Sequence, residues 1–301
     1  MELRHLSLLR ELRDRGSVAA VAATTWRTPS AVSQQLRTAE RDLGVRLVEA
    51  DGRGLRLTDE GRLLADAALD VETALARAQS RLDEFRGQIA GEVRIAALPS
   101  AIEYLAPRLL VALRDLPVEV RLDDVDVAEE DFVDMADDYD LVIGHTMRPA
   151  APRRRGLVIH EVVREPLDVV IPQDHRWARR RSIRPDEVIR EPWITVPAGY
   201  PFRSLLDRIE RATGRPADVV QEVRDNRVVE ALVAAGVGIA LLPRFTTRPH
   251  PAVRLLQLRD VDSARRVLVM ARRDRAERAL VRHVIQQLLT IGRSLTAEAS
   301  D

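Results

Sequence analysis

The sequence predicts an α/β chain in three successive parts, and three patterns carry the prediction. Residues 1–58 show the pattern of short helices followed by a hairpin, residues 59–88 that of one long helix, and residues 92–297 that of alternating strands and helices. The length agrees, because 301 residues correspond to about two or three domains at roughly 150 residues each. With 46% apolar and 31% charged residues, we expect a folded chain with a sizeable core.

The composition excludes several classes of protein. Acidic and basic residues cancel at 47 each, and all the basic ones are arginine, so any basic surface must be local. Cysteine is absent, which excludes disulfides, thiolate metal sites and cysteine nucleophiles. No stretch approaches the roughly 18 apolar residues of a membrane span, and charges interrupt the N-terminus as they do not in a signal peptide. We expect a cytoplasmic protein without a membrane partner.

The first part begins with three helices. Leucines at helical spacing predict a helix over residues 3–14 that ends before Gly16, and Ser17 is placed to cap a second short helix. Thr28 or Pro29 begins the third, since proline is tolerated where the backbone N–H has no helical partner. The alternative interpretation is a small helical core with an ordinary solvated face.

The outer face of the third helix favours DNA binding. Its apolar residues point one way, while short hydroxyl and amide side chains lie at its start and an arginine lies one turn later. Hydroxyls and amides suit base edges, and arginine suits phosphate. We therefore predict a recognition helix that contacts DNA through Thr28, Pro29, Ser30, Ser33, Gln34 and Arg37.

A hairpin follows this helix. Gly52, Arg53 and Gly54 lie between two short apolar strands within residues 47–58, which gives the hairpin a basic tip. Such a hairpin is typical of the wing of a winged helix-turn-helix. We expect Arg53 and Arg56 to contact the DNA backbone or the minor groove.

The long helix carries a narrow apolar seam. From Leu57 onward, apolar and small residues alternate in steps of four and three, the spacing of a coiled coil. A helix lying against its own domain usually has a wider stripe, so the pattern favours a partner helix and a homodimer. The predicted dimerisation residues are Leu64, Ala68, Val71, Leu75, Ala78, Leu82 and Phe85.

The remainder alternates strand and helix, which predicts a parallel sheet wrapped by helices. We expect two lobes joined by crossing segments, one over about 92–161 and 268–297 and the other over about 162–267. Strand ends and helix starts meet in the cleft between such lobes, which is the usual ligand site. The candidate contacts are Ser100, Ile102, Thr146, Thr195, Phe202, Arg203 and Ser204.

The charge of the ligand stays open from these residues. Helix N-termini and Arg203 favour an anion, whereas Leu98, Ile102 and Phe202 suit an apolar molecule equally well. Each hydroxyl has the alternative role of a plain helix cap, and only their shared location favours a site.

The run SVAAVAATTWRTPSAVSQQLRTAERDLGVRL, followed by GRGLRLTDEG, resembles the N-terminal domain of LysR-type transcriptional regulators, and the similarity continues along most of the chain. The resemblance implies a periplasmic-binding-protein-like effector domain, dimers that pair into tetramers, and promoter DNA, a small-molecule effector and RNA polymerase as partners. It also implies association with the nucleoid when DNA is bound. Thr25 and Ala39 stand where the family usually has leucine, so we expect Trp26 to fill part of a thinner core.

No motif indicates an enzyme, a cofactor or a metal. Gly236 and Gly238 form an incomplete nucleotide-binding pattern and are better interpreted as a helix stop. The acidic stretch over 123–140 lacks the spacing of a calcium loop, and the six histidines are scattered. A solute receptor and an enzyme acting in the cleft remain the alternatives to a gene regulator.

Overall fold

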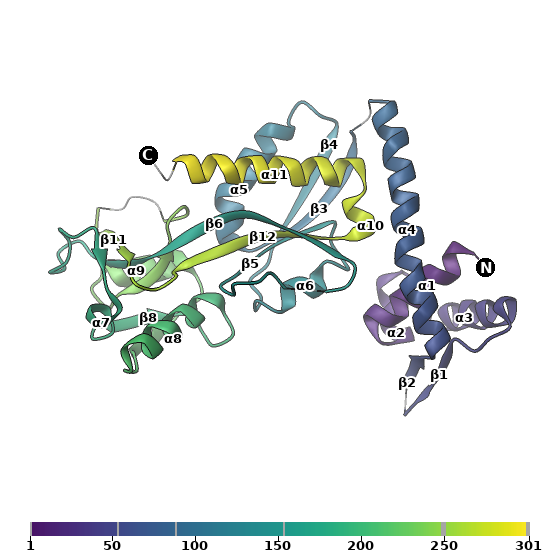
Figure 1. Cartoon of the computed structure of the whole chain (residues 1–301), viewed down its shortest axis with the longest axis horizontal. Coiled ribbons are helices and arrows are strands. Elements are labelled where there is room, and N and C mark those ends of the chain that lie inside the picture. Colours follow the sequence, from purple (N-terminus) through teal and green to yellow (C-terminus); the bar gives the residue numbers. More distant parts are fainter. Residues whose placement is uncertain (1, 53, 88, 153, 248–250, 299–301) are drawn as a thin grey trace. The chain divides into compact units, whose positions relative to one another are not determined.

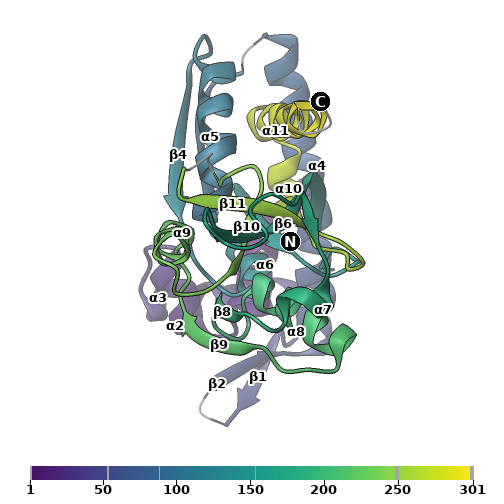
Figure 2. The ribbon, with the colours of Figure 1, turned by 90° about the vertical axis from the view of Figure 1, so that its left-hand side faces the viewer.

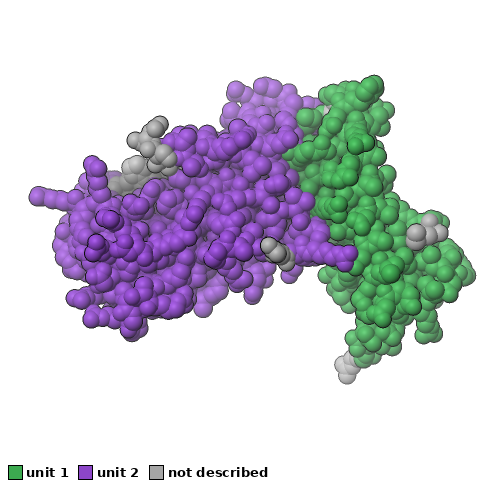
Figure 3. Space-filling view, viewed as in Figure 1, with its two compact units in different colours: residues 1–89, 272–282 green, residues 90–271, 283–301 purple. Residues whose placement is uncertain are grey.

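The computed structural model describes residues 2–52, 54–87, 89–152, 154–247 and 251–298. The chain divides into two compact units (Figure 3). Unit 1 contains residues 1–89 and 272–282, and unit 2 contains residues 90–271 and 283–301. None of the helices within the described ranges is both long and apolar enough to cross a membrane.

Unit 1 is helical with one hairpin (Figure 1). Hydroxyl caps set its helix starts: Ser17, Thr28 and Thr58 each accept a hydrogen bond from the backbone N–H three residues later. The elements are α1 (Leu3–Arg15), α2 (Val18–Thr24), α3 (Pro29–Leu43), β1 (Val48–Asp51), β2 (Gly54–Leu57), α4 (Asp59–Phe85) and α10 (Arg273–Ala276).

The core of unit 1 lies between α1, α2, α3 and the hairpin. Helix α3 buries Val32, Leu36 and Ala39 there. The start of α4 packs against the hairpin at Gly61, where an added Cβ would lie 2.2 Å from the carbonyl oxygen of Leu47, so glycine permits the close approach.

The prediction that Trp26 fills this core is wrong. Its side chain is 96% exposed, because it occupies the turn between α2 and α3 with a left-handed backbone (φ 55°). Leu47 and Leu57 from the hairpin are buried in the core cluster instead.

Residues 272–282 also differ from the prediction, which placed them in the first lobe. They pack within unit 1, where their charged side chains lie beside opposite charges along α4. The ion pairs are Arg273 with Asp70 at 3.1 Å, Glu277 with Arg77 at 2.7 Å and Arg282 with Glu84 at 2.8 Å.

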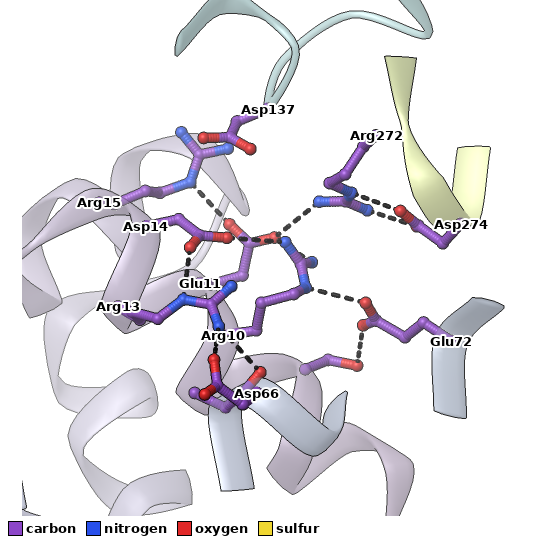
Figure 4. Close-up of polar contacts among 12 residues, drawn as sticks. Arg10, Glu11, Arg13, Asp14, Arg15, Asp66, Glu72, Asp137, Arg272 and Asp274 are labelled. Atoms are coloured by element: carbon purple, nitrogen blue, oxygen red, sulfur yellow. Dashed lines mark hydrogen bonds and ion pairs between the residues drawn. The ribbon is translucent and has the colours of Figure 1, made fainter. Parts of the chain in front are cut away.

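A partly buried ion-pair network joins α1, α4 and α10 (Figure 4). The buried Arg10 contacts Glu11 at 2.6 Å and Glu72 at 2.8 Å. Arg272, which contacts Asp274 at 2.6 Å, also lies 3.9 Å from Glu11. Burial raises the pKa of Glu11, but Arg10 and Arg15 outweigh it, so the pKa lies below its ordinary value.

Unit 2 is built on an eight-stranded sheet with helices around it (Figure 1). Its first lobe contains β3 (Gly91–Ala97), α5 (Pro99–Leu113), β4 (Val118–Asp124), α6 (Asp131–Met135), β5 (Leu141–Thr146) and most of α11 (Ala279–Glu298). Strands β4, β3 and β5 are parallel neighbours. Helices α5 and α11 are joined by Arg108, which donates to Glu298 at 2.9 and 3.0 Å.

The second lobe adds further strands and helices (Figure 2). They are β7 (Ser182–Ile183), α7 (Pro185–Val188), β8 (Pro192–Thr195), α8 (Pro201–Thr213), β9 (Asp218–Glu222), α9 (Asn226–Ala234), β10 (Ala240–Pro243) and β11 (Val253–Leu258). A core cluster of this lobe contains the fully buried Trp193, whose indole N–H donates to the carbonyl of Val188 at 3.1 Å.

Two long strands connect the lobes, β6 (Leu157–Pro172) and β12 (Ala264–Arg272). The expected parallel sheet is found in β4, β3 and β5 but not here, since β12 runs antiparallel to β5, and β10 and β11 run antiparallel to β6. The apolar run from Leu167 to Pro172 predicts a strand that starts at 167, whereas β6 begins ten residues earlier, at Leu157. Glu165 and Pro166 interrupt its apolar pattern, which is why the sequence indicated only its second half.

Candidate functional site

The DNA-facing candidates lie together at the start of α3. Thr28 is the N-cap, accepting from Ala31 N at 3.2 Å, and its hydroxyl also contacts that of Ser30 at 2.9 Å. Pro29 is the first helical residue. These three side chains, Gln34 and Arg37 are exposed, and Ser33 is half-buried. Val32 and Leu36 are buried on the opposite side, so the polar side is presented outward.

The guanidinium of Arg37 is hydrogen-bonded to an uncharged side chain. Its Nη2 donates to Oε1 of Gln34 at 2.9 Å, and no acidic partner is found for it within the described ranges. An exposed guanidinium that is not in an ion pair can bind a phosphate without first breaking one.

Of the two predicted wing arginines, the structure describes only Arg56. Arg56 lies on β2 opposite Glu49, and their side chains form an ion pair of 2.9 Å. Contact with phosphate would therefore compete with Glu49. Arg53 lies outside the described residues.

The seam of α4 divides into a buried and an exposed part. Leu64 is partly buried against the core of unit 1 and Ala68 is fully buried, so both residues pack within their own chain. Beyond them, the seam is exposed, with 43% for Val71, 56% for Leu75, 41% for Leu82 and 90% for Phe85. Ala78 is exposed too. An apolar stripe of this kind is a candidate interface.

A cavity of about 780 Å³ opens in unit 2 where the two lobes meet. The first lobe contributes the start of α5, the end of β4 and His145, and the second contributes the starts of α8 and α9. Ser100, Ile102 and Phe202, three of the predicted contacts, line it. Its size is typical of a small-molecule site.

The floor of the cavity is a buried polar group centred on β12. Arg265 is fully buried and pairs with Glu165, which is also fully buried, through Nη2 at 2.6 Å and Nε at 2.7 Å. Arg265 Nη1 donates to Ser100 Oγ at 2.9 Å and to His145 Nδ1 at 3.2 Å. Burial, and next Arg265, lower the pKa of His145 well below its ordinary value, so the imidazole is neutral.

The mouth of the cavity carries charges from both lobes. Arg224 lies 3.6 Å from Asp126, and Arg227 lies 3.9 Å from Glu103, so each pair links the second lobe to the first. Arg224 also donates to the hydroxyl of Tyr200 at 3.0 Å. Asp225 caps α9, accepting from Arg227 N at 2.7 Å.

Four predicted ligand contacts do not line this cavity. The hydroxyl of Thr146 is buried and donates to Glu129 at 2.5 Å, and Thr195 is buried at the end of β8. Arg203 turns along its own helix to donate to Asp207 at 3.0 Å. Ser204 donates to the carbonyl of Pro201 at 2.7 Å, as a local cap does. All four lie near element ends as predicted, but the side chains of Thr146, Arg203 and Ser204 hydrogen-bond to local partners.

Sequence reasoning missed Arg265, Glu165 and His145. Two opposite charges inside otherwise apolar strands were the available signal, since an ion in a buried strand requires a partner. The sequence could not show that β6 and β12 are neighbours, so it could not pair the two residues. Among the described residues, no group of acidic, histidine or cysteine side chains is arranged to hold a metal.

Comparison with known proteins finds a family match in each of two parts of the chain. The family described as the LysR substrate binding domain matches residues 86–292, and the bacterial regulatory helix-turn-helix protein, lysR family, matches residues 3–62. The chain belongs to the LysR family of bacterial transcriptional regulators. The predicted fold class, with a helix-turn-helix part and an α/β effector-binding part, is confirmed.

Individual relatives of the LysR family cover most of this chain. The regulator CbbR of Xanthobacter flavus is 29% identical over 281 residues, covering 91% of this chain and 83% of the relative. MetR of Escherichia coli K12 is 30% identical over 250 residues, covering 81% and 75%. A full-length OxyR variant of Pseudomonas aeruginosa superposes with a TM-score of 0.64 at 19% identity, covering 97% and 98%, which shows the shared fold. The LysR-type chain is thus a DNA-binding regulator with an effector-binding domain, and its relatives are not enzymes.

Proposed function

We propose that this LysR-type regulator binds promoter DNA as a homodimer or homotetramer and responds to a small molecule in the cavity of unit 2. The exposed polar face of α3, with Arg37 hydrogen-bonded to Gln34, carries the DNA part of the proposal. Thr28, Pro29, Ser30, Ser33 and Gln34 would face base edges, while Arg37, Arg53 and Arg56 would contact phosphate.

The exposed apolar seam of α4 supports a partner helix. A two-fold dimer would present two recognition helices about 34 Å apart, which suits two half-sites on one face of the duplex. We propose residues 1–58 as the DNA-binding domain, 59–88 as the dimerisation helix and 92–297 as the effector domain, the segment over 272–282 packing with the helix.

The regulatory step in this proposal is a shift between two arrangements. A ligand that contacts both lobes stabilises one of them, and it acts only through its different affinity for the two, typically about 1–3 kcal/mol. The changed spacing of recognition helices would alter the bend of the DNA and the access of RNA polymerase. Such a regulator works in the cytoplasm, at the nucleoid.

DNase footprinting on the DNA upstream of its own gene tests the proposal. The full chain should protect two half-sites, and a ligand bound in the cavity should change the footprint or the bend. Ser33→Ala and Gln34→Ala should alter sequence preference, with the exposed Gln173→Ala in unit 2 as the control. Equal loss on specific and random DNA would mean that α3 is not the reading helix.

The side chain that favoured an anionic effector does not reach the cavity. The sequence favoured an anion through helix N-termini and Arg203, and Arg203 is paired with Asp207 outside the cavity lining. The helix starts that also favour an anion do line the cavity, so the charge of the effector depends on the side chains that surround them.

A further inference from the structure

The hydrogen bond between Arg265 and His145 determines which ring nitrogen of His145 carries the proton. Arginine has only donors, so His145 Nδ1, which receives a hydrogen bond from Arg265, must be an acceptor. The proton of the neutral ring is therefore on Nε2. Within the described residues, Nε2 has no hydrogen-bond partner, and His145 lines the cavity.

The hydroxyl of Ser100, like the ring of His145, receives a hydrogen bond from Arg265. Its oxygen accepts from Arg265 Nη1, so its own hydroxyl hydrogen remains available to the cavity at the second residue of α5. The floor thus offers donors, the Ser100 O–H and the His145 Nε2–H. The neighbouring carboxylate of Glu165 does not line the cavity, and its two oxygens accept from Arg265 and from the N–H of Phe245 at 2.8 Å.

The positive charge at the floor is already compensated. Arg265 and Glu165 contact each other directly and are both fully buried, so together they present no net charge to a ligand. The ring of Phe202, 5.5 Å from the guanidinium carbon, covers another side of Arg265.

The rest of the cavity wall has more carboxylates than arginines. Glu103, Asp124, Asp126 and Asp225 line it, against Arg224 and Arg227. Both arginines lie beside a carboxylate, and Asp124 is exposed at the end of β4. A cavity lined mainly by one sign of charge attracts the opposite sign and repels its own.

We propose that the effector is an uncharged or cationic compound whose buried end is a carbonyl-type hydrogen-bond acceptor, and not a carboxylate. This rests on the proposed function, in which the cavity is the effector site. The acceptor receives the Ser100 and His145 hydrogens, an apolar body packs on Ile102 and Phe202, and an amine is favoured at the acidic mouth.

Matched pairs of small ligands test the proposal on the full-length protein. The probes are benzamide against benzoate and 3-phenylpropionamide against 3-phenylpropionate, together with 4-(aminomethyl)benzamide, measured by ligand-observed NMR titration at pH 7.5. Each amide should bind at least about fivefold more tightly than its acid, and the amine-bearing amide most tightly. Ile102→Trp, which fills the cavity, should abolish the amide signal.

A charge-neutralising pair of substitutions at the mouth sharpens the test. Asp124→Asn with Asp126→Asn removes two negative charges from exposed positions and should reduce the amide preference severalfold. Asp174→Asn with Asp186→Asn makes the same change at exposed positions outside the cavity lining and should leave the preference unchanged.

Glu165→Gln tests the floor directly. It leaves the Arg265 charge uncompensated, so benzoate should now bind more tightly than benzamide. If this buried substitution unfolds the protein by circular dichroism, the mouth variants decide instead.

Carboxylates that bind as tightly as their amides in the unmodified protein would overturn the proposal, as would amide binding that survives Ile102→Trp. Other outcomes test the proposed regulatory function. An anionic ligand that occupies the cavity and shifts the footprint overturns the ligand class and supports the regulator, whereas cavity ligands of every class that leave the footprint unchanged overturn the regulatory role.

Discussion

The recognition helix and the ligand cavity use arginine in opposite ways. On α3, Arg37 is exposed and hydrogen-bonded to the uncharged Gln34. In the cavity, Arg265, Arg224 and Arg227 each lie beside a carboxylate. An arginine without an acidic partner attracts phosphate through its net charge, while an arginine paired with a carboxylate supplies directed donors and adds no net charge to the pair. In our proposal, the same residue type serves charge recognition in unit 1 and hydrogen-bond recognition in unit 2.

Removing the buried arginine should have the largest effect. Arg265→Ala leaves Glu165 buried without its partner, so we expect unit 2 to lose about 3–5 kcal/mol of unfolding free energy. The half-exposed Arg224→Ala is the matched control and should cost less than about 1 kcal/mol. Urea unfolding followed by circular dichroism measures both, and equal losses would contradict the distinction between floor and mouth.

A homodimer formed through the α4 seam should present two DNA-binding surfaces, one from each copy of unit 1. Leu75→Asp places a carboxylate in the exposed apolar stripe, so the dimer should dissociate and promoter affinity should fall by about 100-fold because bivalent binding is abolished. Leu63→Asp, on the same helix but off the seam and 68% exposed, is the control. Analytical ultracentrifugation and fluorescence anisotropy check this. A dimer that survives Leu75→Asp would place the interface elsewhere.

Acid should lower the unfolding free energy of unit 1 by weakening its ion-pair network. We expect this effect to be smaller than the effects of Arg265→Ala and Leu75→Asp. Burial raises the pKa of Asp274, but its hydrogen bonds and charge interaction with Arg272 lower it further, below the unfolded value. The resulting stability is therefore present at neutral pH and is lost as the pH falls through about 4 and below.

Thermal unfolding between pH 7 and pH 3 measures this decrease in stability. Asp274→Asn should flatten the pH dependence, and Asp42→Asn on the surface of α3 should not. An unchanged slope in Asp274→Asn would assign the acid sensitivity to other carboxylates.

The two regions also differ in how far the sequence predicts them. The site on α3 is local, because one helix and its Thr28 cap determine which side chains share a face, and helical spacing alone placed them. The same spacing did not show that Leu64 and Ala68 are used inside the chain, since α1 and the hairpin cover that end of α4 only in the folded unit.

The cavity required tertiary information. Ser100, Ile102 and Phe202 were found because helix starts meet in such a cleft. Arg203 and Ser204 were placed at the right helix start but turn to Asp207 and Pro201, and local partners of this kind are invisible to spacing. The Arg265–Glu165 pair joins strands a hundred residues apart.

The salt dependence of DNA binding tests the contrast most directly. For the full chain and Arg37→Ala, promoter affinity should be measured by fluorescence anisotropy from low to high ionic strength, with the exposed Arg190→Ala of unit 2 as the control. Arg37→Ala should reduce the slope of log affinity against log salt by about 0.9 for each phosphate that the variant no longer neutralises, and Arg190→Ala should not. A slope that is the same in all three proteins would contradict the assignment of α3 as the helix that binds DNA through uncompensated charge.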